Sequence, residues 1–136
     1  MAMMYVAEDE CIHDIRDAID RIECIVGEML EFAGTHGDAG PFGREDGAAR
    51  ERLHILDAAM QELSGAVPRL FRDDTSGPFA RRFLADLTVA RTAVTMVIQQ
   101  RAINRAMIES LGSLSALQSF LGELAFIDQV LLNSRH

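Results

Sequence analysis

An unbroken helical pattern of apolar residues near the N-terminus constrains this chain more than any other feature. Between residues 12 and 33, apolar side chains recur at alternating steps of three and four residues. That spacing places them along one side of an α-helix as a continuous seam, and it predicts a helix over residues 8–33. The seam consists of Ile12, Ile15, Ile19, Ile22, Val26, Met29 and Ala33.

Three further segments have helical spacing, and stretches rich in Gly and Pro separate the first three of the four helices. The pattern predicts a helix over residues 46–66, which should end before Pro68 because proline lacks the N–H group that a helix interior needs. A third helix is expected over residues 77–111 and a fourth over residues 115–132. The weak break at Gly112 leaves open whether these last two form one continuous helix.

The pattern favours a single all-α domain over residues 1–136, an antiparallel bundle of about four helices. No segment of useful length alternates apolar and polar residues as a strand would. The segment 115–132 has Glu123 and Asp128 as its only charged residues. Such a helix is too apolar for a free surface, so we expect it to be buried in the bundle or in the interface of a homodimer.

Charge is concentrated in the first third of the chain. The formal net charge is −8, and residues 1–47 hold 12 acidic residues against 3 arginines, a net of −9. This balance disfavours direct binding of nucleic acid. The helix 8–33 therefore presents either a solvated acidic face or a docking face for a basic partner, with Asp14, Asp17 and Asp20 as the candidate contact residues.

The sequence has no pattern typical of catalysis or of cofactor binding. Its histidines and cysteines lack metal-ligand spacing, and all 13 basic residues are arginine, so lysine chemistry is excluded. We therefore expect a non-enzymatic protein without a metal or cofactor. No apolar run reaches the length of a membrane span, and the N-terminal residues lack the basic and apolar segments of a secretion signal, which predicts a cytoplasmic protein without membrane contact.

Two polar residues interrupt the apolar face of the predicted helix 77–111. Extending its stripe by steps of three and four reaches Arg101 and Asn104. A polar residue on such a seam often fixes register or oligomeric state. Alternatively, these two residues with Arg105 frame a small-ligand pocket or a partner contact, or they lie exposed at the edge of the bundle.

Two windows of the chain resemble the TraM-type quorum-sensing antiactivators. The first window joins two helices: it reads Glu-Leu-x-x-Ala-Val-Pro-x-x-Phe-Arg from Glu62, followed by a Gly-Pro turn and Arg82-Phe83-Leu84. The second lies near the C-terminus, between residues 115 and 133. This chain has additional helical turns between the two windows and an extra acidic helix before them.

The resemblance implies a small helical dimer that binds a LuxR-type transcription activator and blocks its binding to DNA. By matched position, it assigns partner contact to Leu63, Phe71, Arg82 and Phe83. We therefore predict a regulatory protein–protein interaction module, with a protein partner that is a transcription regulator. A chaperone for an export substrate of the secretion or flagellar type is the alternative, and a ligand-binding helical bundle is the third.

Overall fold

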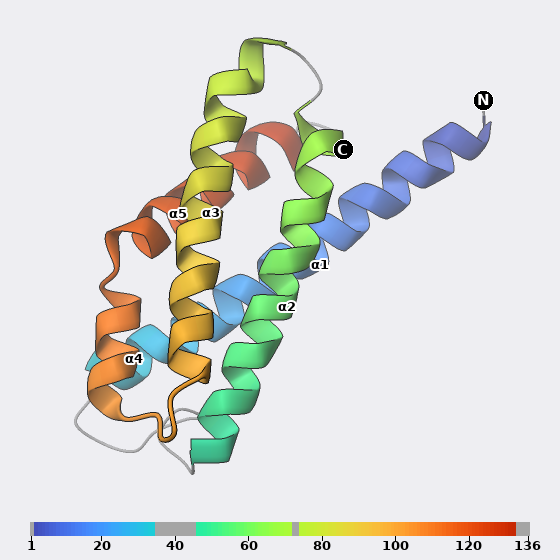
Figure 1. Cartoon of the computed structure of the whole chain (residues 1–136). Coiled ribbons are helices and arrows are strands. Elements are labelled where there is room, and N and C mark those ends of the chain that lie inside the picture. The colour runs from blue at the N-terminus through green and yellow to red at the C-terminus, as the bar shows by residue number, and fades with distance from the viewer. Residues whose placement is uncertain (1, 35–45, 72–73, 133–136) are drawn as a thin grey trace.

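The computed structural model shows an all-helical chain, and its described residues contain no strand. It describes the backbone of residues 2–34, 46–71 and 74–132, and the side chains of residues 13–32, 48–71 and 75–132. Five helices and two short helical turns follow one another along the chain (Figure 1). They are α1 (Ala2–Gly34), α2 (Asp46–Leu70), η2 (Asp74–Ser76), α3 (Gly77–Ile98), α4 (Arg105–Gly112), α5 (Ser115–Ile127) and the π-helical turn η3 (Asp128–Leu132).

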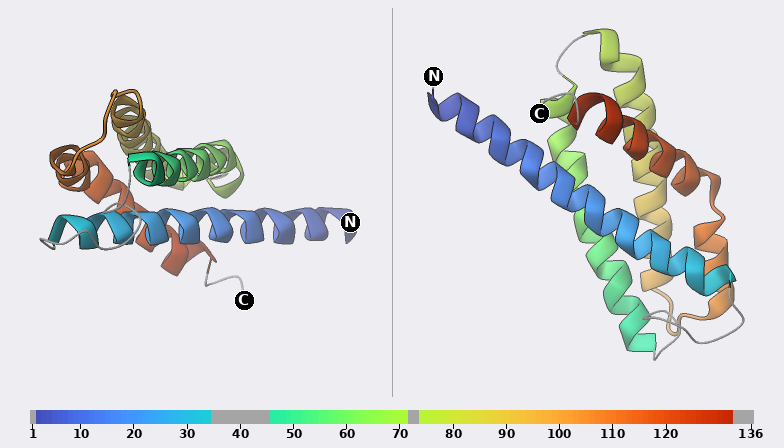
Figure 2. Two further views of the ribbon diagram at one scale, coloured as in Figure 1. Left: turned by 90° about the horizontal axis from the view of Figure 1, so that it is seen from below. Right: turned by 180° about the vertical axis from the view of Figure 1, so that it is seen from behind.

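The helices lie in two layers. The helices α2 and α3 run antiparallel side by side, while α1 crosses behind α2 and α5 crosses behind α3 (Figures 1 and 2). The short helix α4 closes one end of this arrangement and packs against the C-terminal part of α1. The first turns of α1 project beyond the ends of the other helices in both views of Figure 2.

The core confirms the apolar seam of the first helix wherever its side chains are described. Ile15, Ile19 and Ile22 are at most 2% exposed, and Val26 and Met29 follow them into the same core. Full burial of one such side chain stabilises the fold by about 1.5–3 kcal/mol. The other helices add the remaining core residues, chiefly Leu53, Leu56, Met60, Leu63, Phe83, Leu87, Val94, Ile108, Leu117, Phe120, Leu124 and Ile127.

The helix α2 extends past Pro68, so the predicted end at residue 66 is wrong. The chain remains helical to Leu70, and the Phe71 amide still donates to the Val67 carbonyl oxygen at 3.0 Å. Pro68 itself is exposed, which allows water to satisfy the carbonyl group that its missing N–H leaves without a partner. Burial of Val67 and partial burial of Leu70 stabilise this last turn.

The predicted helix 77–111 is also wrong as a single element, because the chain breaks between α3 and α4. α3 ends at Ile98, and α4 begins only at Arg105 after a non-helical connection. Asn104 caps α4: its side-chain oxygen accepts a hydrogen bond from the Met107 amide at 2.9 Å. The fourth predicted helix, 115–132, consists of α5 followed by the π-helical turn η3.

Arginine side chains bind the last carbonyl groups at three helix ends. Arg50 donates to the carbonyl oxygens of Ile98 and Gln100 after α3, and Arg105 donates to Phe32 in the last turn of α1 at 2.7 Å. Arg16 donates to the carbonyl oxygen at residue 132, the end of η3, at 2.8 Å. The last carbonyl groups of a helix lack partners within it and carry partial negative charge, so these guanidinium groups stabilise the joints between helices.

Candidate protein interface

The outward face of α1 is strongly acidic. Among its described side chains, Asp14, Asp17 and Asp20 are exposed, as are Glu23 and Glu31. Residues three positions apart are neighbours on a helix surface, so these carboxylates repel one another unless a cation lies near them. The face therefore has a charge that a basic partner would neutralise.

Arg21 is the only arginine among the exposed, described side chains of α1, and it already has a partner. Its guanidinium donates to Glu62 of α2 at 2.7 Å, in a pair whose side chains are 44% and 53% exposed. Arg21 therefore links α1 to α2 but offsets little of the charge on the acidic face of α1.

A hollow of 460 Å³ lies beside the acidic face, between α1 and α2. Its rim is charged, with Asp14, Asp17 and Glu62 set against Arg21 and Arg69. Its floor is apolar and nearly buried: Ile15, Ala18 and Ala66 are 1–3% exposed, above the fully buried Leu63. Such a hollow suits a long cationic side chain, which would place its alkyl stem on the apolar floor and its charged head beside the carboxylates.

The residues that the resemblance assigned to partner contact serve mainly the core. Leu63 and Phe83 are both 0% exposed, so neither can contact a partner in the folded protein. Phe71 is half-buried, with its ring centroid 5.6 Å from that of Phe79 and 6.3 Å from that of Phe83. The joint is therefore an aromatic cluster, and sequence position alone could not distinguish this packing role from a docking role.

Arg82 is exposed, but it belongs to a cluster of charged groups between α3 and α5. Its Nε atom lies 3.0 Å from an oxygen of Asp86 and 3.9 Å from an oxygen of Glu123. Asp86 is buried, and Glu123 has one buried carboxyl oxygen without a hydrogen-bond partner. In the sequence, Glu123 is one of two acidic residues in the segment 115–132, and no spacing within that segment indicates that it meets Asp86.

The two carboxyl groups of this cluster have displaced pKa values. Burial, together with the hydrogen bond to Asp86 and its negative charge, raises the pKa of Glu123 to about 7. For Asp86, burial favours the neutral acid, but hydrogen bonds with Glu123 and Arg82 outweigh it and lower its pKa. Glu123 is thus the group that holds the shared proton, and Asp86 is the carboxylate.

A third acidic side chain, at the junction of α1 and η3, also has a raised pKa. Burial, followed by the negative charges of Asp128 and Asp20, raises the pKa of Glu23. The acidic face of α1 therefore extends onto η3, although these residues lie more than a hundred positions apart in the sequence.

The predicted polar seam does not form. Arg101 is exposed in the connection between α3 and α4, and Asn104 is the cap of α4. The chain leaves the helix where its stripe turns polar, so neither residue continues the apolar stripe of α3; Arg101 faces solvent, and Asn104 lies at an open groove between α3 and α4. Arg105 binds the end of α1 and lies 4.0 Å over the Phe32 ring, which is a structural role.

The break after α3 creates an open groove between α3 and α4, with a volume of 450 Å³. We call it the α3/α4 groove. Its lining includes no charged residue, and the residues are Ala93, Met96, Val97, Gln100, Asn104, Ala106, Met107, Ser110, Leu111 and Leu114. A continuous helix over 77–111 would have left no such groove, which is why the sequence pattern did not indicate it.

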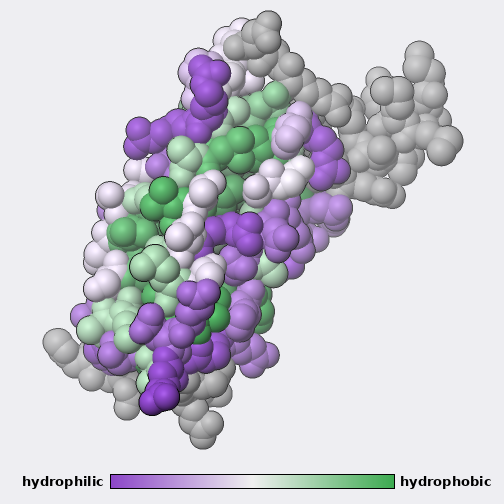
Figure 3. Space-filling view, viewed as in Figure 1, coloured by the Kyte–Doolittle hydropathy of each residue, from purple (hydrophilic) through white to green (hydrophobic). Residues whose placement is uncertain are grey.

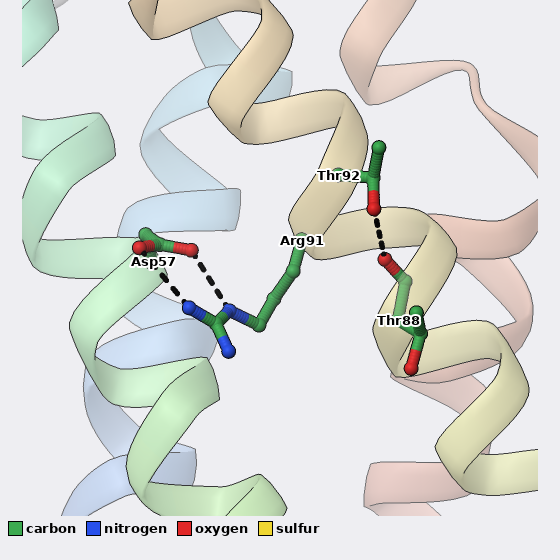
Figure 4. A network of polar contacts seen from close by, with 4 residues as sticks. All are labelled: Asp57, Thr88, Arg91 and Thr92. Carbon is green, nitrogen blue, oxygen red and sulfur yellow. Dashed lines mark hydrogen bonds and ion pairs between the residues drawn. The ribbon is translucent and has the colours of Figure 1, made fainter.

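The outward side of α3 above the groove also lacks charge. Arg91 turns toward α2, where its guanidinium binds Asp57 at 2.9 and 3.5 Å (Figure 4). Thr92 donates its hydroxyl group to the carbonyl oxygen of Thr88 (Figure 4), and Thr88 donates its own to the carbonyl oxygen of Leu84, so both bonds stay within α3. Hydrophobic and neutral side chains accordingly dominate the side of the molecule formed by α3 and α5 (Figure 3).

The described residues include no group of His, Cys, Asp and Glu that could hold a metal ion. No single described helix is long and apolar enough to cross a membrane; α4 and the segment from α5 to η3 reach that length and composition only together, and they are bent by 52°. Comparisons of the chain with protein-family models, with curated proteins and with solved structures gave no match.

Proposed function

We propose that this protein is a non-enzymatic regulatory module that acts by binding a protein with a basic surface. One observation carries the proposal: five exposed carboxylates occupy the described outward face of α1, and its one exposed arginine is already paired with Glu62. Complementary charge accelerates encounter and favours the correct partner over others. The hollow beside this face adds apolar surface that a cationic side chain can cover.

The partner that we propose is a LuxR-type transcription activator. Support comes from the joint around Phe71 and Arg82, which resembles the TraM-type antiactivators, and from the acidic face of α1. DNA-binding proteins carry basic surfaces that contact phosphate groups, so an acidic helix that covers such a surface would compete with DNA. In this mechanism, the aromatic cluster maintains the fold and the acidic face provides the contact.

We further propose that the protein acts as a dimer of antiparallel helical bundles. The exposed side of α3 and α5 supports this, because Val89, Met96 and Phe126 are 51%, 59% and 52% exposed there, and Arg81 and Arg82 at the start of α3 are the only exposed charged residues of these two helices. Isolated apolar residues are common on protein surfaces, but a nearly uncharged, partly apolar side is typical of an interface.

The test uses a LuxR-type activator from the same genome and a labelled fragment of its promoter. We expect the wild-type protein to release the activator from DNA in a gel-shift titration. The variant Asp14→Asn/Asp17→Asn should require at least ten times more protein for the same release. Its matched control, Glu51→Gln/Glu109→Gln, removes two exposed carboxylates from other helices and should behave as wild type.

Two results would contradict the proposal. The first is an activator that stays on its DNA at saturating wild-type protein. The second is equal loss of activity in both double variants, since overall charge rather than the face of α1 would then be responsible. Rising salt should weaken the wild-type effect, because exposed charges are screened over about 8 Å at physiological ionic strength.

A further inference from the structure

The α3/α4 groove is a site without an occupant in the described chain. Met96 is 59% exposed at its edge, and the half-buried Met107 and Leu114 form part of its wall. Methionine side chains are flexible and polarisable, so a methionine-lined groove can adapt to an apolar helix. The absence of charge from its lining excludes an ionic ligand as its natural occupant.

The N-terminal end of α1 is an apolar helical segment that extends away from the molecule. Residues 2–7 read Ala-Met-Met-Tyr-Val-Ala, and we call this segment the N-terminal arm. In the described chain, no other helix runs beside the arm in either view of Figure 2. Burial against another apolar surface stabilises a helical segment of this composition.

The arm cannot reach the groove of its own chain. α1 is one continuous helix of 33 residues, and its C-terminal part is the part that packs against α4. A helix rises about 1.5 Å per residue, so the arm lies tens of ångströms from the groove, at the opposite end of α1. Only a second molecule can bring an arm to this groove.

The charges next to the arm and next to the groove are complementary. Glu8, Asp9 and Glu10 follow the arm directly in the sequence. At the groove, the exposed Arg101 lies in the α3–α4 connection, between the lining residues Gln100 and Asn104. An arm that docks with its C-terminal end toward the α3–α4 connection would place these acidic residues beside this cation, and charge attraction favours that direction.

We propose that the occupant is a second copy of this chain, whose N-terminal arm docks in the α3/α4 groove. Two copies related by a two-fold axis then exchange arms, so that each groove receives the arm of the other molecule. The uncharged arm meets an uncharged lining, and the acidic residues behind the arm meet Arg101. This exchange specifies how the dimer is built and is independent of the identity of the regulated partner.

The first experiment measures the mass of the full-length protein by light scattering across a concentration series. We expect the wild type to be a dimer, and Met96→Glu to raise the dissociation constant at least tenfold. Leu30→Glu is the matched control: it adds the same charge to an exposed apolar position of α1, which lies neither in the groove lining nor on the side formed by α3 and α5, and it should remain dimeric. Circular dichroism checks that both variants retain their helices.

The second experiment identifies the contact directly. Cys11 and Cys24 are replaced by serine, Met107 is changed to cysteine, and Met3, Met4, Tyr5 or Val6 is changed to cysteine in turn. Mild oxidation should give a disulfide-linked dimer for at least one arm position, and none when the groove cysteine is replaced by Leu30→Cys on α1.

A monomeric wild type would overturn the proposal. So would a dimer that tolerates Met96→Glu and gives no arm-to-groove disulfide, because the molecules would then associate through another face. Failure of the gel-shift test leaves these results unaffected, so the two proposals fail separately.

Discussion

The two helix pairs that build this molecule are held together by different forces. Between α1 and the α2 helix, exposed or partly exposed ion pairs surround the apolar seam: Arg21 binds Glu62, and Arg52 binds Glu28. Between α3 and α5, aromatic rings dominate, and the described charges are confined to the cluster of Arg82, Asp86 and Glu123. The first pair therefore offers the solvent a charged face, and the second offers a nearly uncharged one.

This difference separates two tasks that a small helical protein must combine. Exposed carboxylates cost little stability because water solvates them, so α1 can devote its outer face to recognition. The side formed by α3 and α5 gains more from burial than from solvation, which suits permanent association with another copy. Substitutions within each helix pair therefore test whether that pair depends on the force assigned to it.

The largest effect should follow from removal of the ring of Phe83. This side chain is 0% exposed, and its ring centroid lies 5.4 Å from that of Phe120. Phe83→Ala should lower the free energy of unfolding by about 3–5 kcal/mol, as large cavities in aromatic cores do. Urea denaturation followed by circular dichroism measures it. Phe126→Ala, at a half-exposed position, should cost far less; equal losses would contradict the core role of Phe83.

The second largest effect is a change of stability with pH, caused by the charged cluster between α3 and α5. Since the pKa of Glu123 rises from 4.5 to about 7 on folding, the unfolded chain binds fewer protons between these values, and stability falls as pH rises through this window. The full shift corresponds to about 3 kcal/mol, and partial solvent access reduces it to about 1–2 kcal/mol. Below pH 4 the lowered pKa of Asp86 acts oppositely, because protonation of Asp86 removes stability.

Glu123→Gln imitates the protonated acid and isolates this effect. The variant should match the wild type near pH 5 and exceed its stability near pH 8, because the amide keeps the hydrogen bond to Asp86 without the second charge. Thermal unfolding at both pH values measures the difference. The control Glu109→Gln changes an exposed carboxylate of α4 and should follow the wild-type profile; a Glu123→Gln profile parallel to the wild type would refute the assignment.

A smaller effect is expected at the arginine that joins α4 to α1. Arg105→Lys keeps the charge but loses the planar group that donates to the Phe32 carbonyl oxygen and lies over the Phe32 ring. The expected loss is about 1 kcal/mol, the usual value of one partly buried hydrogen bond or cation–π contact. Denaturant unfolding of Arg101→Lys provides the control, since Arg101 lies exposed in the nearby connection. Equal stability of the two variants would refute the joint role.

The sequence pattern was most informative where burial follows helical periodicity. The alternating spacing from Ile15 to Met29 predicted both the helix and its buried face, because one strong apolar seam determines the orientation of a helix. The same method failed at Pro68 and at residues 99–104. There, the outcome depends on tertiary contacts: the packing of Val67 and Leu70 against the core, and a distant Arg50 that binds the end of α3.

The candidate site was only partly predictable for a similar reason. Exposure of Asp14, Asp17 and Asp20 follows from their place off the seam, so helical periodicity found them. The α3/α4 groove and the contact between Asp86 and Glu123 join residues from different helices, and no spacing within one helix encodes such a meeting. Leu63 and Phe83 were predicted to contact a partner, but both are buried. A motif that resembles a family's motif cannot distinguish residues that build a joint from residues that contact a partner.

The smallest effect on the free energy of unfolding is expected for the acidic face of α1, if that face serves recognition rather than stability. Asp17→Asn and Arg21→Gln alter exposed charges of α1, and each should change the free energy of unfolding by less than about 0.5 kcal/mol, since exposed ion pairs contribute little. The matched change between two partly buried charges, Arg91→Gln, should cost more, because Asp57 then keeps its charge beside α3 without a partner. Guanidinium unfolding is unsuitable here because the salt screens exposed charges; urea titrations at low ionic strength give the comparison. If the exposed variants proved as costly as Arg91→Gln, the acidic face would be a structural element, and its proposed role in binding would lose its physical basis.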